Sequence, residues 1–82
     1  MTWDVEWSPV AIRDLRRIPW RVAAAVDHEI MRIARGLAPD GSIERMVPTD
    51  PSRYRLRLQS ARVFFWVDRP GRTIHVTRVF RH

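Results

Sequence analysis

Residues 53–68 read RYRLRLQSARVFFWVD, and this stretch decides the fold. Its first six residues alternate arginine with tyrosine or leucine, a period of two that predicts a β-strand with one polar and one apolar face. Arg62–Val67 is aromatic and β-branched, which predicts a second strand after the short connection Gln59–Ala61. We therefore expect a hairpin that carries Arg53, Arg55 and Arg57 along one face.

The segments on either side of this hairpin continue the sheet. Asp68–Gly71 predicts a tight turn, with Pro70 and Gly71 in the order of a type II turn. Thr73–Phe80 is again β-branched and predicts a last strand. Residues 37–52 predict a loop, with room for one short strand at Ile43–Val47, because they contain four residues that break regular structure, Pro39, Gly41, Pro48 and Pro51.

The N-terminal half predicts one strand and two helices. TWDVEWS (2–8) alternates tryptophan and valine with acidic residues, as in a half-buried strand. Ser8-Pro9 fits an N-cap followed by the first helical residue, and the helix should run to about Arg17. Pro19 ends it, and a second amphipathic helix follows at Trp20–Arg35, with Gly36 as C-cap.

This order of elements predicts one α+β domain spanning residues 1–82. The order is β-α-α-β-β-β, with a helical hairpin packed on one face of a small, twisted, antiparallel-rich sheet. The chain has no cysteine, so neither disulfides nor thiolate metal ligands are available. Its longest apolar run, Val63–Val67, is far shorter than the roughly 20 residues that span a bilayer, and we expect a cytoplasmic protein.

Positive charge is concentrated in the second half of the chain. The net charge is +6; residues 1–42 contain six arginines and six acidic residues, whereas residues 43–82 contain nine arginines and three acidic residues. Clustered positive charge suits a polyanion or an acidic protein. All fifteen basic residues are arginine, which contacts phosphate in bidentate geometry. A genome rich in GC explains the missing lysines equally well, but not the clustering.

Two explanations of the arginine row remain open. An antiparallel sheet often leaves one face to water, and the row is then only a solvated surface. A solvated face usually mixes charges, because like charges opposite each other repel. Bound phosphates explain a one-signed face better, and Arg62, Arg78 and Arg81 of the next strands would then extend it.

Three stretches of the sequence resemble the RelE/ParE superfamily of toxins from bacterial toxin–antitoxin pairs. WSPVAIRDLRRIP (7–19) is similar to the opening helix of the family, YRLRLQSARVFFWVD (54–68) to its central hairpin, and TIHVTRVFRH (73–82) to its last strand. The resemblance covers essentially the whole chain. It implies the RelE-like microbial ribonuclease fold and a toxin of a type II pair.

The two branches of this superfamily imply different activities. RelE-like members cleave messenger RNA in the ribosomal A site, without metal and through attack by the 2′-OH, whereas ParE-like members inhibit DNA gyrase and are not nucleases. We favour a ribosome-dependent endoribonuclease that blocks translation. A gyrase inhibitor, or a degenerate toxin that only binds its antitoxin, remains the alternative.

Cleavage needs a proton donor and acceptor, which arginine cannot be because its pKa lies above about 12. A resemblance to the YoeB-like subgroup implies Glu44 as base, Arg62 as the ligand of the scissile phosphate and His82 as acid. The subgroup follows its histidine with a terminal tyrosine, which this chain lacks after His82. Glu44 also fits an ordinary loop carboxylate, and His82 an ordinary chain end. The arginines predicted to bind RNA phosphates are Arg53, Arg55, Arg57, Arg78 and Arg81.

The roles of the remaining aromatic side chains depend on which face of the sheet they occupy. Phe64 and Trp66 share the parity of Arg62 and would stack on bases if their face is open; packing beneath the 37–52 loop is the interpretation we favour. Tyr54 has the opposite parity and should pack in the core or at an edge. His75 alternates with apolar residues and is assigned a structural role.

The resemblance also implies the partners. We expect a cognate antitoxin, the 70S ribosome and messenger RNA, and no membrane, metal ion or cofactor. The toxin–antitoxin complex should be hetero-oligomeric and should bind operator DNA through the antitoxin.

Overall fold

The computed structural model describes residues 2–36, 43–47 and 50–81, and for residues 43–47, 50 and 51 it describes the backbone only. The elements in this part of the chain are β1 (Asp4–Trp7), α1 (Pro9–Arg16), α2 (Trp20–Ala34), β2 (Ile43–Val47), β3 (Asp50–Arg57), β4 (Ala61–Asp68) and β5 (Thr73–Arg81). No helix among them is long and apolar enough to span a membrane.

The ends of both helices follow the predicted signals. The hydroxyl of Ser8 accepts a hydrogen bond from the N–H of Ala11 at 3.0 Å, and Pro9 is the first residue of α1. Pro lacks an N–H and has a helical φ, so it costs nothing at this position. Helix α2 begins directly after Pro19 and ends before Gly36, whose positive φ of 81° reverses the chain.

The strands form one mixed sheet in the order β1-β5-β4-β3-β2. Strand β1 pairs with β5 in parallel, and the other three pairs are antiparallel. The predicted α+β class and the antiparallel-rich sheet are confirmed. The short segment Ile43–Val47 does form a strand, β2, which adds a fifth strand beyond the order β-α-α-β-β-β.

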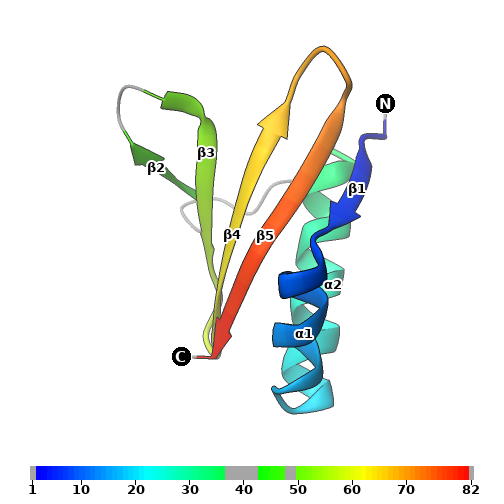
Figure 1. The fold of residues 1–82 in the computed structure, drawn as a ribbon, viewed down its shortest axis with the longest axis vertical. Helices are drawn as coiled ribbons and strands as arrows, with labels where there is room; N and C mark the ends of the chain where they lie inside the picture. Colours follow the sequence, from blue (N-terminus) through cyan, green and yellow to red (C-terminus); the bar gives the residue numbers. More distant parts are fainter. Residues whose placement is uncertain (1, 37–42, 48–49, 82) are drawn as a thin grey trace.

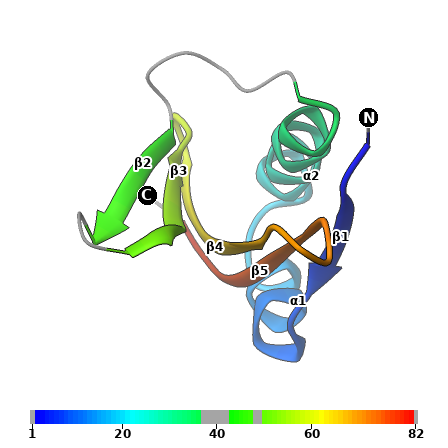
Figure 2. The same cartoon turned by 90° about the horizontal axis from the view of Figure 1, so that it is seen from above.

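The core lies between α2 and the sheet. Buried residues of α2 at Val26, Ile30 and Ala34 pack with every second residue of the central strands, which include Leu56, Val63 and Val76. Figure 1 shows the two helices beside the long strands β4 and β5. Seen from above in Figure 2, β3 and β2 curve away from the helices, so this end of the sheet has no helical cover.

Helix α1 covers the edge of β5 where β1 has ended. Strand β1 pairs with β5 only over Thr73–Val76, and in Figure 1 α1 continues below β1 beside the lower half of β5. The buried carboxylate of Asp14 accepts the backbone N–H of Val79 at 2.9 Å. The helix therefore satisfies an edge donor that no strand partner reaches.

The β4–β5 turn differs in type from the prediction. A type II turn requires a positive φ at Gly71, but the positive φ of 51° belongs to Arg72. The N–H of Arg72 donates to the carbonyl of Arg69 at 3.2 Å, and the N–H of Gly71 donates to the Asp68 carboxylate at 3.2 Å. A Cβ on Gly71 would collide with that carboxylate, so a larger residue here would displace the Asp68 side chain.

Candidate nucleic-acid interface

The side of β3, β4 and β5 that faces away from α2 carries three rows of cross-strand neighbours, which we call the open face. The rows are Arg57, Arg62 and Phe80, then Arg55, Phe64 and Arg78, and finally Arg53, Trp66 and His75. Each row thus combines at least one arginine with an aromatic ring. Basic groups interleaved with aromatic rings are typical of surfaces that bind single-stranded nucleic acid.

A bulge in β5 brings His75 and Arg78 to the same face. Residues three apart in a regular strand point to opposite faces, but the register shifts here: Phe65 pairs with Val76 and Phe64 pairs with Arg78. Thr77 is the extra residue, and its hydroxyl donates to the carbonyl of Phe64 at 3.1 Å. The bulge therefore aligns both halves of β5 with the arginines of β3.

The aromatic rings of the open face are ordered by one another and partly exposed. Trp66 lies parallel to the imidazole of His75, with centroids 4.0 Å apart and an interplanar angle of 7°. Phe64 and Phe80 form an edge-to-face pair at 5.5 Å. Trp66 and Phe80 keep 37% and 43% of their surface exposed. Trp66 therefore packs on its sheet neighbour and still presents ring surface to solvent.

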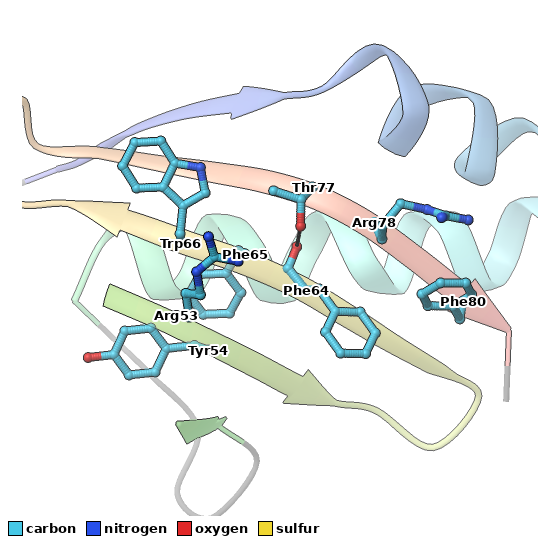
Figure 3. Close-up of a pocket in the computed structure, with 8 residues that line it drawn as sticks. All are labelled: Arg53, Tyr54, Phe64, Phe65, Trp66, Thr77, Arg78 and Phe80. Carbon is cyan, nitrogen blue, oxygen red and sulfur yellow. Dashed lines mark hydrogen bonds between the residues drawn. The ribbon is translucent and has the colours of Figure 1, made fainter. Parts of the chain in front are cut away.

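These rings surround a hollow of about 300 Å³, shown in Figure 3. It is lined by Arg53, Tyr54, Phe64, Phe65, Trp66, Thr77, Arg78 and Phe80. Figure 3 shows Trp66 and Phe64 on β4, Thr77 and Phe80 on β5, and Arg53 close to Trp66. Tyr54 instead stacks on the buried Phe65 at 5.6 Å, which confirms its predicted packing role.

Arg62 lies at the start of β4, half-buried, with its guanidinium against the β3–β4 turn. Its Nη1 donates to the carbonyl oxygens of Leu58 and Ala61 at 3.0 and 3.2 Å. Arg57 lies directly across the strand pair from it. Two arginines are thus cross-strand neighbours at this end of the open face, and guanidinium groups are bidentate donors to phosphate.

Arg78 is engaged by a carboxylate. Its Nε and Nη2 donate to Asp14 at 2.9 and 3.4 Å, and its guanidinium lies 4.5 Å from the Phe80 ring centroid. The hydrogen bond from Arg78 holds the pKa of Asp14 below its ordinary value; the Val79 N–H and nearby positive charge act in the same direction, and burial opposes them. The pair also raises the pKa of Arg78. Arg78 therefore joins α1 to β5.

Several solved structures share this fold. It superimposes on a chain of the RelBE2 toxin–antitoxin complex of Mycobacterium tuberculosis with a TM-score of 0.83 and 22% identity, covering 100% of both chains. The chain has the RelE toxin fold. A double mutant of the E. coli toxin RelE in the free state matches with a TM-score of 0.80 and 15% identity, over 96% of this chain and 82% of that one. The DinJ–YafQ toxin–antitoxin complex of E. coli matches with a TM-score of 0.75 and 9% identity, over 100% and 94%.

The likeness to RelE is one of structure rather than sequence. No protein-family model matches the sequence, and no curated protein is similar enough to it to be a sequence relative. Backbone geometry survives at identities where sequence signals fade, since many side-chain sets fill one core. The predicted RelE-like fold is confirmed, and the chemistry of this RelE fold has to be inferred from its own residues.

The predicted proton-transfer residues are only partly placed on the RelE fold. The backbone of Glu44 pairs with Arg55, which puts it two strand spacings from β4, about 10 Å. Its side chain and all of His82 lie outside the described residues. Arg81 pairs with Ala61, which is fully buried on the side of the helices. Arg81 is therefore not on the open face, contrary to the sequence-based grouping with Arg78.

His75, expected to have a structural role, and Glu6, which the sequence analysis did not single out, meet at the β1 edge of the sheet. The Nδ1 atom of His75 lies 3.3 Å from a carboxylate oxygen of Glu6, its cross-strand neighbour. The alternation of His75 with the buried Ile74 and Val76 was the available signal, because it excludes the core face. Contact with Trp66 on β4 and Glu6 on β1 depends on strand order, which no local pattern contains.

Proposed function

We propose that the chain is the toxin of a type II toxin–antitoxin pair and acts as a ribosome-dependent endoribonuclease that blocks translation. The observation that carries this proposal is the open face, where Arg57 and Arg62 are direct neighbours and exposed rings lie beside them. Two arginines on neighbouring strands offer an RNA backbone two bidentate donors at one place. The RelE fold supports the same proposal.

The proposed reaction is metal-independent: the phosphorus of the cut linkage passes from the 5′-oxygen of the next nucleotide to the neighbouring 2′-oxygen. A base removes the proton of the 2′-OH, the 2′-oxygen bonds to phosphorus, and the bond from phosphorus to the 5′-oxygen breaks as an acid protonates that oxygen. We assign the base to Glu44, the acid to His82 and stabilisation of the phosphorane-like charge to Arg62. Arg53, Arg55 and Arg57 then hold the neighbouring phosphates.

The contacts of Arg62 suit this assignment. One nitrogen, Nη1, makes both hydrogen bonds to the turn carbonyls, so the turn fixes the position of the guanidinium before any substrate arrives. A donor held in place in advance stabilises developing charge without a cost of reorganisation. Arg78 is joined to Asp14 instead, and we assign it mainly to the structure of the interface.

The partners follow from the toxin assignment. Structural neighbours include the RelBE2 and DinJ–YafQ toxin–antitoxin complexes. We propose that this chain is likewise neutralised by a cognate antitoxin, in a hetero-oligomer that binds operator DNA through the antitoxin. The 70S ribosome would present the messenger RNA to the open face.

The test is cleavage of a defined message on programmed ribosomes, mapped by primer extension. Wild type should cut in the A site, and Arg62→Ala should lower the cleavage rate by about 10²- to 10³-fold, the usual loss when one transition-state donor is removed. Arg16→Ala, which removes an exposed arginine of α1, is the matched control and should cut like wild type.

Thermal unfolding separates loss of chemistry from loss of fold. Arg62 also contacts the β3–β4 turn, so Arg62→Lys is included; it keeps the charge and should retain part of the activity if the charge acts on phosphate. Growth arrest by a folded protein that makes no cuts would contradict the nuclease and favour a ParE-like gyrase inhibitor. Neither cuts nor arrest would favour a degenerate toxin that only binds its antitoxin.

A further inference from the structure

The hollow has one end at Trp66, away from the proposed cleavage site, and another at Phe80, the cross-strand neighbour of Arg62. Trp66 follows Arg62 by four residues on the same face of β4, a distance of about 14 Å along the strand. A group bound there belongs to a nucleotide that flanks the cut linkage rather than to the linkage itself. A ligand group bound beside Trp66 is therefore a different group from the phosphate bound at Arg62.

Building on the function proposed above, we propose that this hollow binds one unstacked nucleobase of single-stranded RNA against the exposed face of Trp66. The imidazole of His75 covers one face of the indole in a parallel stack at 4.0 Å. The 37% of Trp66 that remains exposed therefore lies on the other face and the ring edges. A base on that face would extend the stack to His75, Trp66 and base.

The surrounding side chains prepare Trp66 for this contact. Glu6 lies 3.3 Å from Nδ1 of His75 and so restrains the imidazole on which the indole rests. The edge-to-face pair of Phe64 and Phe80 forms an apolar wall of the hollow. A ring held in place in advance loses little conformational entropy on binding, which favours affinity.

The size and charge of the hollow favour a base over a protein segment. A volume of about 300 Å³ is at the lower end of the range for small-molecule sites, and it suits one flat ring system. Arg53 is the cross-strand neighbour of Trp66, so a positive charge lies within reach of the phosphate attached to a stacked base. Every base has an aromatic face, so the site should tolerate different bases.

The experiment measures binding without cleavage or ribosomes. The probes are a 2′-O-methyl hexaadenylate, which lacks the attacking hydroxyl, and an abasic hexamer with the same phosphates. Wild type should bind the base-bearing oligomer about 5- to 150-fold more tightly, the range expected for one stacked base. Trp66→Ala should abolish that difference and leave the abasic affinity unchanged, and Trp66→Phe should restore part of it.

Trp20→Ala is the matched control, since Trp20 is 73% exposed at the start of α2 and away from the open face. It should keep the full difference between the two oligomers. Equal affinity of wild type for both oligomers, or a difference that survives Trp66→Ala, would overturn the proposal. Tighter binding of an acidic hexapeptide than of hexaadenylate, lost with Trp66→Ala, would assign the hollow to a protein segment and also overturn it.

The binding experiment and the cleavage assay test the two proposals separately. If ribosomal cuts are absent but the base-dependent affinity is lost with Trp66→Ala, the base site stands and the nuclease does not. If cuts depend on Arg62 but the two oligomers bind equally, the nuclease stands and the base site is wrong.

Discussion

The two faces of strands β3, β4 and β5 are built from alternating residues of the same segments, yet one face is buried and apolar and the other is open and basic. The face toward α2 presents Leu56, Val63 and Val76, all fully buried. The open face presents arginines and partly exposed rings at the positions between them. Burial stabilises the fold through one face, and this leaves the other face free to be selected for binding.

A second contrast lies within the open face, between Arg62 and Arg78. Nη1 of Arg62 donates to two backbone carbonyl oxygens of the β3–β4 turn. Arg78 is neutralised by Asp14 at 2.9 Å. Both are arginines of the open face, so they differ in what holds them: turn carbonyls hold Arg62, and a carboxylate of α1 holds Arg78.

The largest effect on stability is expected from the buried face. Leu56→Ala should lower the free energy of unfolding by about 2–5 kcal/mol, because it removes buried methyl groups and leaves a cavity. Its neighbour Arg57 is exposed on the other face, and Arg57→Ala should change the same quantity by less than about 0.5 kcal/mol. Urea unfolding measures both. Equal losses of unfolding free energy for the two variants would contradict the inference that the buried face, and not the open face, stabilises the fold.

Asp14→Asn should have the next largest effect, a loss of about 1–3 kcal/mol at pH 7, since it removes the charge that pairs with Arg78. The folded-state pKa of Asp14 is lowered, so its carboxylate stabilises the fold above the unfolded pKa near 3.9, and that contribution is lost as the pH falls through the lowered value. Unfolding measured from pH 7 to pH 2 should show the variant and wild type converging below about pH 4.

Asp27→Asn, at an exposed position of α2, is the control for Asp14 and should change the free energy of unfolding at pH 7 by less than about 0.5 kcal/mol. RNA affinity sharpens the comparison between the two arginines. If Arg78 acts on the structure, folded Asp14→Asn should bind the 2′-O-methyl oligomer at least as tightly as wild type. A marked loss of affinity in the folded variant would instead show that the Asp14 contact positions Arg78 for the ligand.

The smallest effect is expected from single phosphate contacts. Arg57→Ala should reduce the slope of log Kobs against log salt for the 2′-O-methyl oligomer by about 0.7, the value for one phosphate contact to a single strand. Arg16→Ala on α1 should leave the slope unchanged. Titrations at four salt concentrations measure both slopes, and identical slopes for the two variants would remove Arg57 from the interface.

Local patterns were sufficient for most of the fold. Ser8-Pro9 specified the start of α1, Gly36 the end of α2, and the alternation of residues 53–58 the two faces of β3. The turn type was wrong, because Arg72 rather than Gly71 takes the positive φ. The extension of β3 back to Asp50 was also missed; pairing with β2 forms this part of the strand, despite the nearby prolines.

The sequence by itself therefore determined the class of fold, the ends of the helices and the arginine row at 53–57, since each depends on residues close together in the chain. Only the tertiary structure decided which arginines share a face. The bulge at Thr77 shifts the alternation of β5, bringing Arg78 to the side of His75 and placing Arg81 with Ala61. The pairing of Arg78 with Asp14 spans 64 positions. Contacts of this kind depend on how strands and helices dock, and no short-range pattern encodes that.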